Sequence, residues 1–333
     1  MKICSHDYSR EELLRRCNPD VLYGARRVEL TDGRGRGSRL IEVKTPGGLR
    51  ASFWEDRCLD IVDLEFCGVN LAFLSKNGLV ADPSHSAEVN NFFKYWQGGF
   101  LLTCGLRNTG PPCEVGGEFF PLHGQIGLTP AEEVNVLTSQ DGVTITGRMR
   151  ETALFGHNLQ MTREIKVSFE RGQIVVKDKV ENLSPVPEPL FLLYHINFGF
   201  PFLGEELALT FPKGEVRGRT DLATEQIGER LKIVPPVDGG QEVVYFYTPD
   251  EKAAQVILAN SRAGVEAKIS YDSERLPVLA QWKSMAAGDY ALGIEPGTSH
   301  IRGRKDELAD GYDLCVPAFE ALEFGFTADF EKI

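Results

Sequence analysis

Apolar residues recur at every second position over much of the chain, and this period limits the fold more than any other feature. In residues 163–169 and again in residues 174–180, apolar and polar side chains alternate around a short turn at Arg171-Gly172-Gln173. Successive side chains of a β-strand point to opposite faces, so the pattern predicts a hairpin with one buried side. The inward set is Ile165, Val167, Phe169, Ile174, Val176 and Val180.

The same alternation recurs elsewhere, while helical patterns are few. Residues 143–150, 265–270 and 320–326 alternate in the same way, and strands dominate from about residue 136 onward. No alternation of strands with long helices and no fixed repeat occurs, which argues against a doubly wound nucleotide-binding sheet. We therefore expect an all-β fold, a large antiparallel β-sandwich with a few short helices.

Two short helices are expected in the first hundred residues. Residues 9–12 (SREE) form a capping box that opens one helix. Val89, Phe92, Phe93 and Trp96 follow helical spacing, and the glycine pair at residues 98–99 ends the second helix.

The chain has 333 residues, and no long run of Ser, Gly and Pro divides it. The proline-rich stretch 184–189 is short and lies between expected strands. All-β sandwiches often exceed the usual length of a domain. We therefore expect residues 1–333 to form a single domain.

Charge, cysteine spacing and hydropathy exclude several classes of partner. The net charge is −12 and no segment clusters Lys or Arg with aromatic residues, so nucleic acid is not an expected partner. Seven cysteines without a C-x-x-C pair and six histidines without a close pair indicate reduced thiols and no metal site. No apolar run is long enough to cross a membrane, and the N-terminus lacks the apolar centre of a secretory signal. We expect a cytoplasmic protein with no membrane partner.

Two histidines and one glutamate stand in unusual surroundings. His123 lies in residues 122–124 (LHG), His195 lies in residues 193–201 (LYHINFGFP), and Glu295 ends an apolar stretch just before a Pro-Gly turn. A single polar residue in such a place is more often a hydrogen-bonded core residue than a catalytic one. Taken together, the two histidines and the glutamate indicate a functional site.

Five segments, taken in order, resemble an uncharacterised branch of the aldose 1-epimerase-like proteins. They are residues 56–61 (DRCLDI), 98–106 (GGFLLTCGL), 122–124 (LHG), 194–199 (YHINFG) and 294–298 (IEPGT). The likeness spans most of the chain, whereas the match to the well-studied galactose mutarotases rests mainly on Arg, His, His and Glu in that order. The resemblance implies a galactose mutarotase-like supersandwich with a carbohydrate site on one open sheet face. It also implies an isomerase of carbohydrate metabolism.

The resemblance also implies roles for particular residues. By position, Glu295 corresponds to the general base of the superfamily and His195 to its general acid. His123 and Arg57 correspond to residues that orient the sugar, and Arg107 competes with Arg57 for that position.

Other residues near these motifs are candidate substrate contacts. Asn197 lies in the motif of His195, and Trp282 can stack on a sugar ring while Lys283 can meet a hydroxyl, carboxylate or phosphate group. Core packing for the Trp and a solvated charge for the Lys are the competing interpretations. Asp238 and Glu242 lie in the stretch where better-known members hold sugar hydroxyls with an acidic residue.

The residue types fit the chemistry without any cofactor. Interconverting the anomers of an aldose needs a base that takes the proton of the C1 hydroxyl and an acid that protonates the ring oxygen. We expect an ionised Glu295 and a protonated His195 that hold each other charged in a partly buried site.

Two other functions fit the same residues. The first is a non-catalytic carbohydrate-binding or sensing protein on the same fold, which would not need both an acid and a base. The second is a lyase or a keto-sugar isomerase, in which the base removes a carbon-bound proton. The sugar and the oligomeric state, including a homo-oligomer, stay open at this stage.

Overall fold

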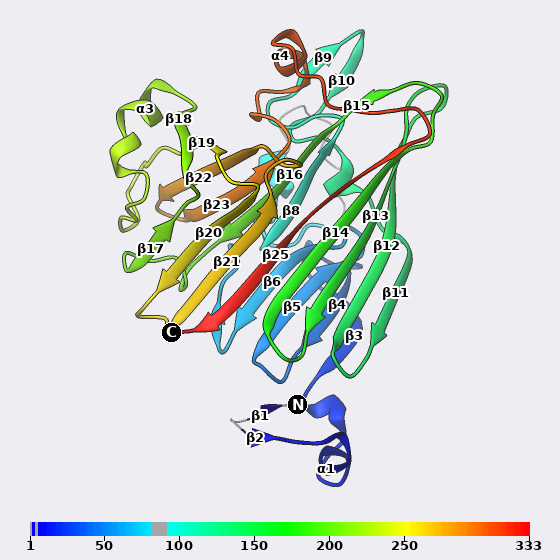
Figure 1. Cartoon of the computed structure of the whole chain (residues 1–333), viewed down its shortest axis with the longest axis vertical. Coiled ribbons are helices and arrows are strands. Elements are labelled where there is room, and N and C mark those ends of the chain that lie inside the picture. The colour runs from blue at the N-terminus through cyan, green and yellow to red at the C-terminus, as the bar shows by residue number, and fades with distance from the viewer. Residues whose placement is uncertain (1, 4–5, 82–91) are drawn as a thin grey trace.

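The computed structural model describes residues 2–3, 6–81 and 92–333, and three antiparallel sheets in two layers build its body (Figure 1). The first layer is a single eight-stranded sheet. In spatial order its strands are β11 (Glu132–Thr138), β12 (Gly142–Thr152), β13 (Asn158–Ser168), β14 (Gly172–Asn182), β25 (Ala321–Lys332), β21 (Val265–Asp272), β20 (Ala253–Asn260) and β17 (Leu207–Thr210). The predicted hairpin is β13–β14, in which Val167 pairs with Ile174, and the predicted all-β sandwich is confirmed.

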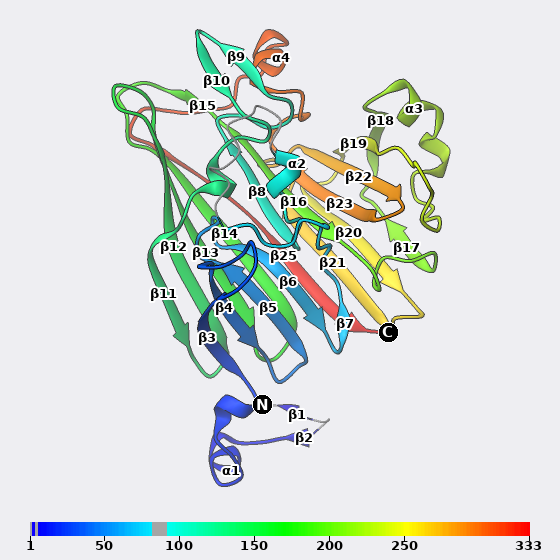
Figure 2. The ribbon, with the colours of Figure 1, turned by 180° about the vertical axis from the view of Figure 1, so that it is seen from behind.

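The second layer consists of two sheets that lie in front of the first in Figure 2. The six-stranded sheet has the order β18 (Gly214–Gly218), β19 (Val243–Pro249), β22 (Val278–Ala286), β23 (Asp289–Gly297), β16 (Phe191–Phe198) and β8 (Leu101–Leu106). The five-stranded sheet has the order β3 (Gly24–Glu29), β4 (Arg39–Lys44), β5 (Leu49–Trp54), β6 (Asp60–Phe66) and β7 (Val69–Asn70). Strands are therefore as regular before residue 136 as after it, which the sequence pattern did not indicate.

Short elements precede the sheets or lie between their strands in the chain. The helical ones are α1 (Arg10–Leu14), η1 (Pro19–Val21), α2 (Phe92–Tyr95), η3 (Ile126–Leu128), α3 (Asp221–Glu225), η4 (Ile227–Glu229) and α4 (Arg304–Ala309). The two-stranded pairs are β1 (Lys2–Ile3) with β2 (His6–Asp7), β9 (Cys113–Val115) with β10 (Glu118–Phe120), and β15 (Glu188–Pro189) with β24 (Cys315–Val316). No helix in the described part of the chain has the length and apolar character needed to cross a membrane.

Both predicted helices are present. The capping box forms at Ser9, whose hydroxyl accepts the Glu12 N–H while the Glu12 carboxylate accepts the Ser9 N–H. α2 covers part of the second predicted helix, whose Val89 lies outside the described residues. The predicted glycine stop is confirmed, because Gly98 and Gly99 both have positive φ angles.

A charged network crosses the apolar core between the two layers. Arg163 on β13 donates to both oxygens of Asp178 on β14, at 2.8 and 2.7 Å, and to Asp60 on β6 at 3.0 Å. Thr103 on β8 donates through its N–H and hydroxyl to Asp60, and the Tyr194 hydroxyl on β16 donates to Asp178. These contacts link the eight-stranded sheet to the strands that carry His195 and its neighbours.

Candidate functional site

The candidate site lies on the face of the six-stranded sheet that points away from the main core. His195 on β16, Trp282 on β22 and Glu295 on β23 point to this face. Their strand neighbours Tyr194 and Ile294 point to the opposite face and pack in the main core. Strand alternation therefore gathers three of the predicted residues from three neighbouring strands.

His195 and Glu295 form a close and nearly inaccessible pair. The His195 Nε2 and Glu295 Oε1 atoms are 3.3 Å apart, and the two residues are 6% and 2% exposed. Gly293 makes room for this arrangement, because a Cβ at that position would overlap Glu295 Oε1 and lie 3.0 Å from the Trp282 Cβ. A glycine two residues before the carboxylate is thus part of the site.

Three aromatic residues, Phe92, Trp96 and Trp282, surround the histidines and are called the aromatic wall below. The ring centroids of Trp282 and Trp96 lie 5.5 and 5.7 Å from the ring centroid of His195, and 5.5 Å from each other. The Phe92 ring lies 5.5 Å from the ring of His123, which is itself 5.9 Å from His195. α2 and the following residue, Trp96, therefore lie over the His195–Glu295 pair. The helical spacing of Phe92 and Trp96 was the sequence signal for this cover.

His123 occupies an uncommon backbone conformation beside the pair. Its φ angle is 59°, in the left-handed region that non-glycine residues seldom adopt. The Gly110 N–H donates to His123 Nδ1 at 3.3 Å, and the His123 N–H donates to the Gly110 carbonyl at 3.0 Å. These two bonds fix the ring next to His195.

Several buried polar atoms of the site have no hydrogen-bond partner among the described residues. They are His195 Nδ1, Asn197 Oδ1, Trp96 Nε1 and Glu295 Oε1, the last of which faces His195 Nε2 at 3.3 Å without a hydrogen bond. The Asn197 amide donates to the carbonyls of Gly99 and His195, which leaves its oxygen available as an acceptor. Buried polar atoms without partners are costly, so their concentration here favours a ligand rich in donors and acceptors.

Burial determines the protonation of the pair. It raises the pKa of Glu295 to about 8, and the nearby Glu242 carboxylate raises that pKa further while Arg219 opposes the rise. Burial lowers the pKa of His195 to about 3, and the neighbouring His123 adds to the fall. The resting pair therefore holds one proton near neutral pH, on the carboxyl group. The resting pair is therefore neutral instead of charged as expected, because the site is fully rather than partly buried.

Among the two acidic candidates for holding sugar hydroxyls, Glu242 contacts the site. The Trp282 Nε1–H donates to Glu242 Oε2 at 2.8 Å. This bond orients the indole ring beside His195 and places a carboxylate at the edge of the site. Asp238 is exposed, in the loop that precedes β19.

The two predicted arginines are engaged elsewhere. The Arg57 guanidinium donates to the Val80 carbonyl at 2.7 Å and lies over the rings of Trp54 and Tyr95, the last of which belongs to α2. It therefore supports the helix that covers the site.

Arg107 belongs to a separate charged cluster. It is paired with Glu118 and Glu188 and lies over the ring of Phe120. The structure does not bring it to the His195–Glu295 pair.

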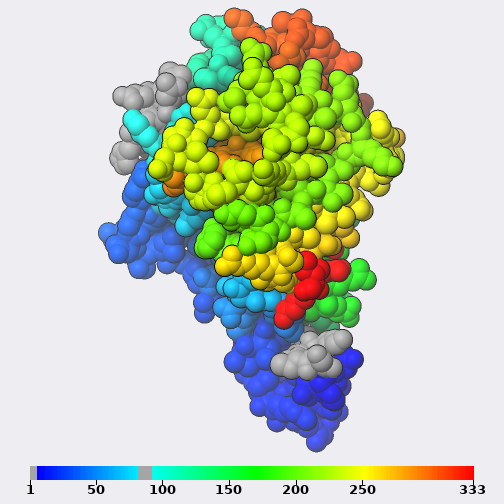
Figure 3. All heavy atoms as spheres, turned by 90° about the vertical axis from the view of Figure 1, so that its left-hand side faces the viewer, coloured from blue at the N-terminus to red at the C-terminus, as the bar shows by residue number. Residues whose placement is uncertain are grey.

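Lys283 points to the opposite face of the sheet from Trp282. Its Nζ donates to the carbonyls of Glu229, at 3.0 Å, and Lys232. In Figure 3 the yellow-green segment after α3 encloses a hollow with orange atoms at its floor. Lys283 thus fastens this segment to the sheet instead of reaching the candidate site.

Arg219 was not identified from the sequence, yet its charge acts on two site residues. It lowers the pKa of Glu295 and that of His123, whose pKa burial brings to about 4. Arg219 directly follows the last residue of β18 and belongs to no recognisable pattern, so the sequence held no signal for it.

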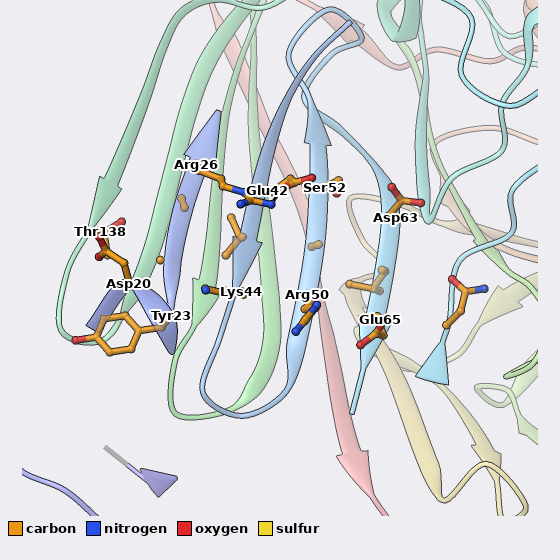
Figure 4. Close-up of a pocket in the computed structure, with 16 residues that line it drawn as sticks. Asp20, Tyr23, Arg26, Glu42, Lys44, Arg50, Ser52, Asp63, Glu65 and Thr138 are labelled. Carbon is orange, nitrogen blue, oxygen red and sulfur yellow. Dashed lines mark hydrogen bonds and ion pairs between the residues drawn. The ribbon is translucent and has the colours of Figure 1, made fainter. Parts of the chain in front are cut away.

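A separate hollow of about 820 Å³ lies on the outer face of the five-stranded sheet (Figure 4). Charged side chains of both signs line it, among them Arg26, Glu42, Lys44, Arg50 and Asp63. Arg26 and Glu42 are paired at 2.7 Å. None of the predicted site residues lines this hollow.

A family model described as a domain of unknown function, DUF4432, matches residues 35–328. The chain belongs to the DUF4432 family. The family is uncharacterised, as the motifs led us to expect. No curated protein matches the DUF4432 chain described here.

Solved structures agree on the fold of this DUF4432 member. A proposed aldose 1-epimerase from Klebsiella pneumoniae subsp. pneumoniae MGH 78578 is 23% identical, with a TM-score of 0.87 over 94% of this chain and 86% of that one. A galactose mutarotase-like protein from Clostridium acetobutylicum is 16% identical, with a TM-score of 0.65 over 93% and 99% of the two chains. Galactose 1-epimerase from Lactobacillus acidophilus NCFM is 12% identical, with a TM-score of 0.62 over 93% and 99%. At these identities the likeness shows the galactose mutarotase-like fold.

Proposed function

We propose that this protein is an enzyme that interconverts the anomers of a sugar by acid-base catalysis at His195 and Glu295. The observation that carries the proposal is the pair itself, with 3.3 Å between Nε2 and Oε1 on one sheet face and the Trp282 ring beside it. A carboxyl group and an imidazole at this separation can exchange one proton with a ligand and with each other.

The single carboxyl proton of Glu295 is enough to start the reaction cycle. When it passes from Glu295 to His195, the pair becomes a carboxylate and an imidazolium. The carboxylate then removes the proton of the C1 hydroxyl while the imidazolium protonates the ring oxygen, and the bond between C1 and the ring oxygen breaks. The open aldehyde rotates about its C1–C2 bond and recloses, which returns both protons and releases the other anomer.

The surrounding residues have supporting roles in this proposal. The Trp282 ring offers an apolar face to the sugar, and Glu242 accepts sugar hydroxyls while it holds the indole. His123 and Asn197 supply further polar contacts at the floor of the site. The aromatic wall keeps water from the opened aldehyde, and Phe92 and Trp96 have to shift for a sugar ring to reach the pair.

The first experiment follows the optical rotation of freshly dissolved α-anomers of neutral, acidic and phosphorylated sugars, with and without protein. We expect at least one sugar to equilibrate faster with the wild-type protein, and the Glu295→Gln and His195→Asn variants to lose about 10²- to 10⁴-fold of that acceleration. Glu274→Gln, at an exposed position in the β21–β22 turn, serves as the control.

Two results would overturn the assignment. One is acceleration that survives in both variants, which would place the chemistry on other residues. The other is saturable binding of a sugar without any acceleration, which would identify a carbohydrate-binding protein instead.

A further inference from the structure

A second hollow, of about 420 Å³, is lined in part by residues that neighbour the candidate site in the chain or in apolar packing. Its lining includes Pro111, Arg219, Ile301, Arg302, Asp306 and Asp310. Ile301 packs in the same apolar cluster as Leu193 and Ala280, which lie on the site face of β16 and β22. Pro111 directly follows Gly110, whose N–H donates to His123. Two lining residues thus border the surroundings of His123 and the site face of β16 and β22, while His123, His195 and Glu295 themselves do not line the hollow.

The backbone of Arg219 is held at the edge of this space. Its N–H donates to the Val244 carbonyl on β19 at 2.9 Å, and Val244 pairs with Trp282 in the sheet. Trp282 in turn pairs with Gly293 on β23, two residues before Glu295. The arginine is thus placed by the same strands that carry the site.

The guanidinium of Arg219 has no ion pair and no hydrogen bond to any described residue. The other arginine that lines the hollow, Arg302, is paired with Glu307 at 3.3 Å and with Asp310. The chain carries 48 Asp and Glu residues against 36 Lys and Arg, so carboxylates are in excess. Arg219 is an exposed residue that lines the hollow, and a guanidinium without a carboxylate partner is suited to an oxyanion from outside.

We propose that Arg219 binds an anionic group, a carboxylate or a phosphate, of the sugar whose anomeric carbon lies at the His195–Glu295 pair. The proposal rests on the proposed function for the position of the sugar. It gives Arg219 the sugar-orienting role that the family resemblance implied for Arg57 or Arg107. Asp306, which also lines the hollow, accepts sugar hydroxyls. The positive charge of Arg219 also favours the ionised form of Glu295, which the reaction needs as a base.

The test measures binding rather than turnover, so that it does not depend on catalysis. Isothermal titration with glucose, galactose, glucuronate, galacturonate and glucose 6-phosphate is carried out on the wild type, Arg219→Gln and Arg219→Lys. We expect one anionic sugar to bind more tightly than its neutral parent, and Arg219→Gln to weaken that binding about 10- to 100-fold. Arg219→Lys should recover part of the affinity. Comparing the uronates with glucose 6-phosphate shows whether Arg219 binds a carboxylate or a phosphate.

Arg262→Gln is the matched control, since it removes one exposed positive charge at the β20–β21 turn of the other layer. Equal affinities for neutral and anionic sugars, or an unchanged affinity in Arg219→Gln, would overturn the inference even if mutarotation is confirmed. Binding of an anionic sugar that depends on Arg219 would support it even if no mutarotation occurs.

Discussion

At the scale of single residues, Glu295 shows how burial changes the chemistry of a side chain. The carboxyl group has an ordinary pKa of 4.5, and its position under the aromatic wall raises that pKa to about 8. The folded state therefore holds the Glu295 proton more tightly than the unfolded state does. Stability from this group is fully present below about pH 4.5 and is lost as the pH rises through 8.

We therefore expect the wild-type protein to lose thermal stability more steeply between pH 7 and pH 9 than Glu295→Gln, whose amide does not titrate. Burial lowers the pKa of His195 to about 3 from 6.5, so stability from His195 is lost only as the pH falls below about 6.5. Between pH 7 and pH 9 the change in stability therefore comes from Glu295 and not from His195. Unfolding temperatures of both proteins at several pH values provide the measurement, and parallel slopes would contradict the raised pKa of Glu295.

We predict that glycine is required at position 293 to leave room for the Glu295 carboxyl group, and not to form the strand. In Gly293→Ala the new methyl group would displace the Glu295 carboxyl, and a misplacement of about 1 Å costs roughly 10²-fold in turnover. The accompanying loss of stability should be about 1–3 kcal/mol. Gly228→Ala, where a Cβ would meet nothing within 4 Å, is the control. Unchanged kinetics in Gly293→Ala would show that the carboxyl position does not matter.

The sequence indicated some site residues and not others for a physical reason. His195, Glu295 and His123 stand out as polar residues in apolar, glycine-flanked segments, and the first two do meet on one sheet face. Lys283 could not be placed, because a one-residue offset from Trp282 sends it to the other face. Arg219 lies in a turn, where no periodicity indicates what its side chain faces.

At the scale of elements, α2 is short but decides access to the pair. Its Phe92 and the following Trp96 contact the two site histidines, and its Tyr95 lies against Arg57. An apolar cover of this kind lowers the local dielectric and strengthens charge interactions beneath it.

We predict that Trp96→Ala lowers turnover about tenfold or more, since it removes the ring contacts that confine His195 and the sugar. Trp96→Phe, which keeps an aromatic ring in the same place, should stay within about threefold of the wild type. Steady-state kinetics on the sugar identified by polarimetry compare the two variants. If both variants behave alike, the ring contacts of α2 do not contribute to catalysis.

The strands themselves were predictable where only one face is buried. β13 and β14 alternate between buried and more exposed residues, and the hairpin predicted from this alternation is confirmed. In β16 all eight residues are buried, so the alternation that would reveal a strand is missing. The register that sets Glu295 opposite Ala280 depends on neighbouring strands and has no local signal.

At the scale of the whole molecule, the Arg163 network joins the two layers behind the site. Arg163 and Asp178 lie on the inward faces of β13 and β14, between the apolar residues that the hairpin pattern identified. Alternation predicted which face is inward but not that a buried ion pair lies on it. The single domain expected for residues 1–333 stays a prediction.

Removing one partner from this network should be costly. Arg163→Met leaves Asp178 and Asp60 buried without their cation, which we expect to reduce the free energy of unfolding by about 3–5 kcal/mol. Lys252→Met, which breaks the exposed pair with Glu274, should cost far less, because solvent screens that pair. Urea denaturation of both variants tests the difference. Similar losses in the two would mean that the buried network contributes no more than a surface pair.

Two-dimensional exchange NMR on an equilibrium mixture of the anomers of the responsive sugar shows directly whether His195 and Glu295 interconvert them. We predict exchange cross-peaks between the α and β anomeric protons with the wild-type protein, and none with a folded Glu295→Gln, His195→Asn double variant. Cross-peaks of equal intensity with both proteins would contradict the claim.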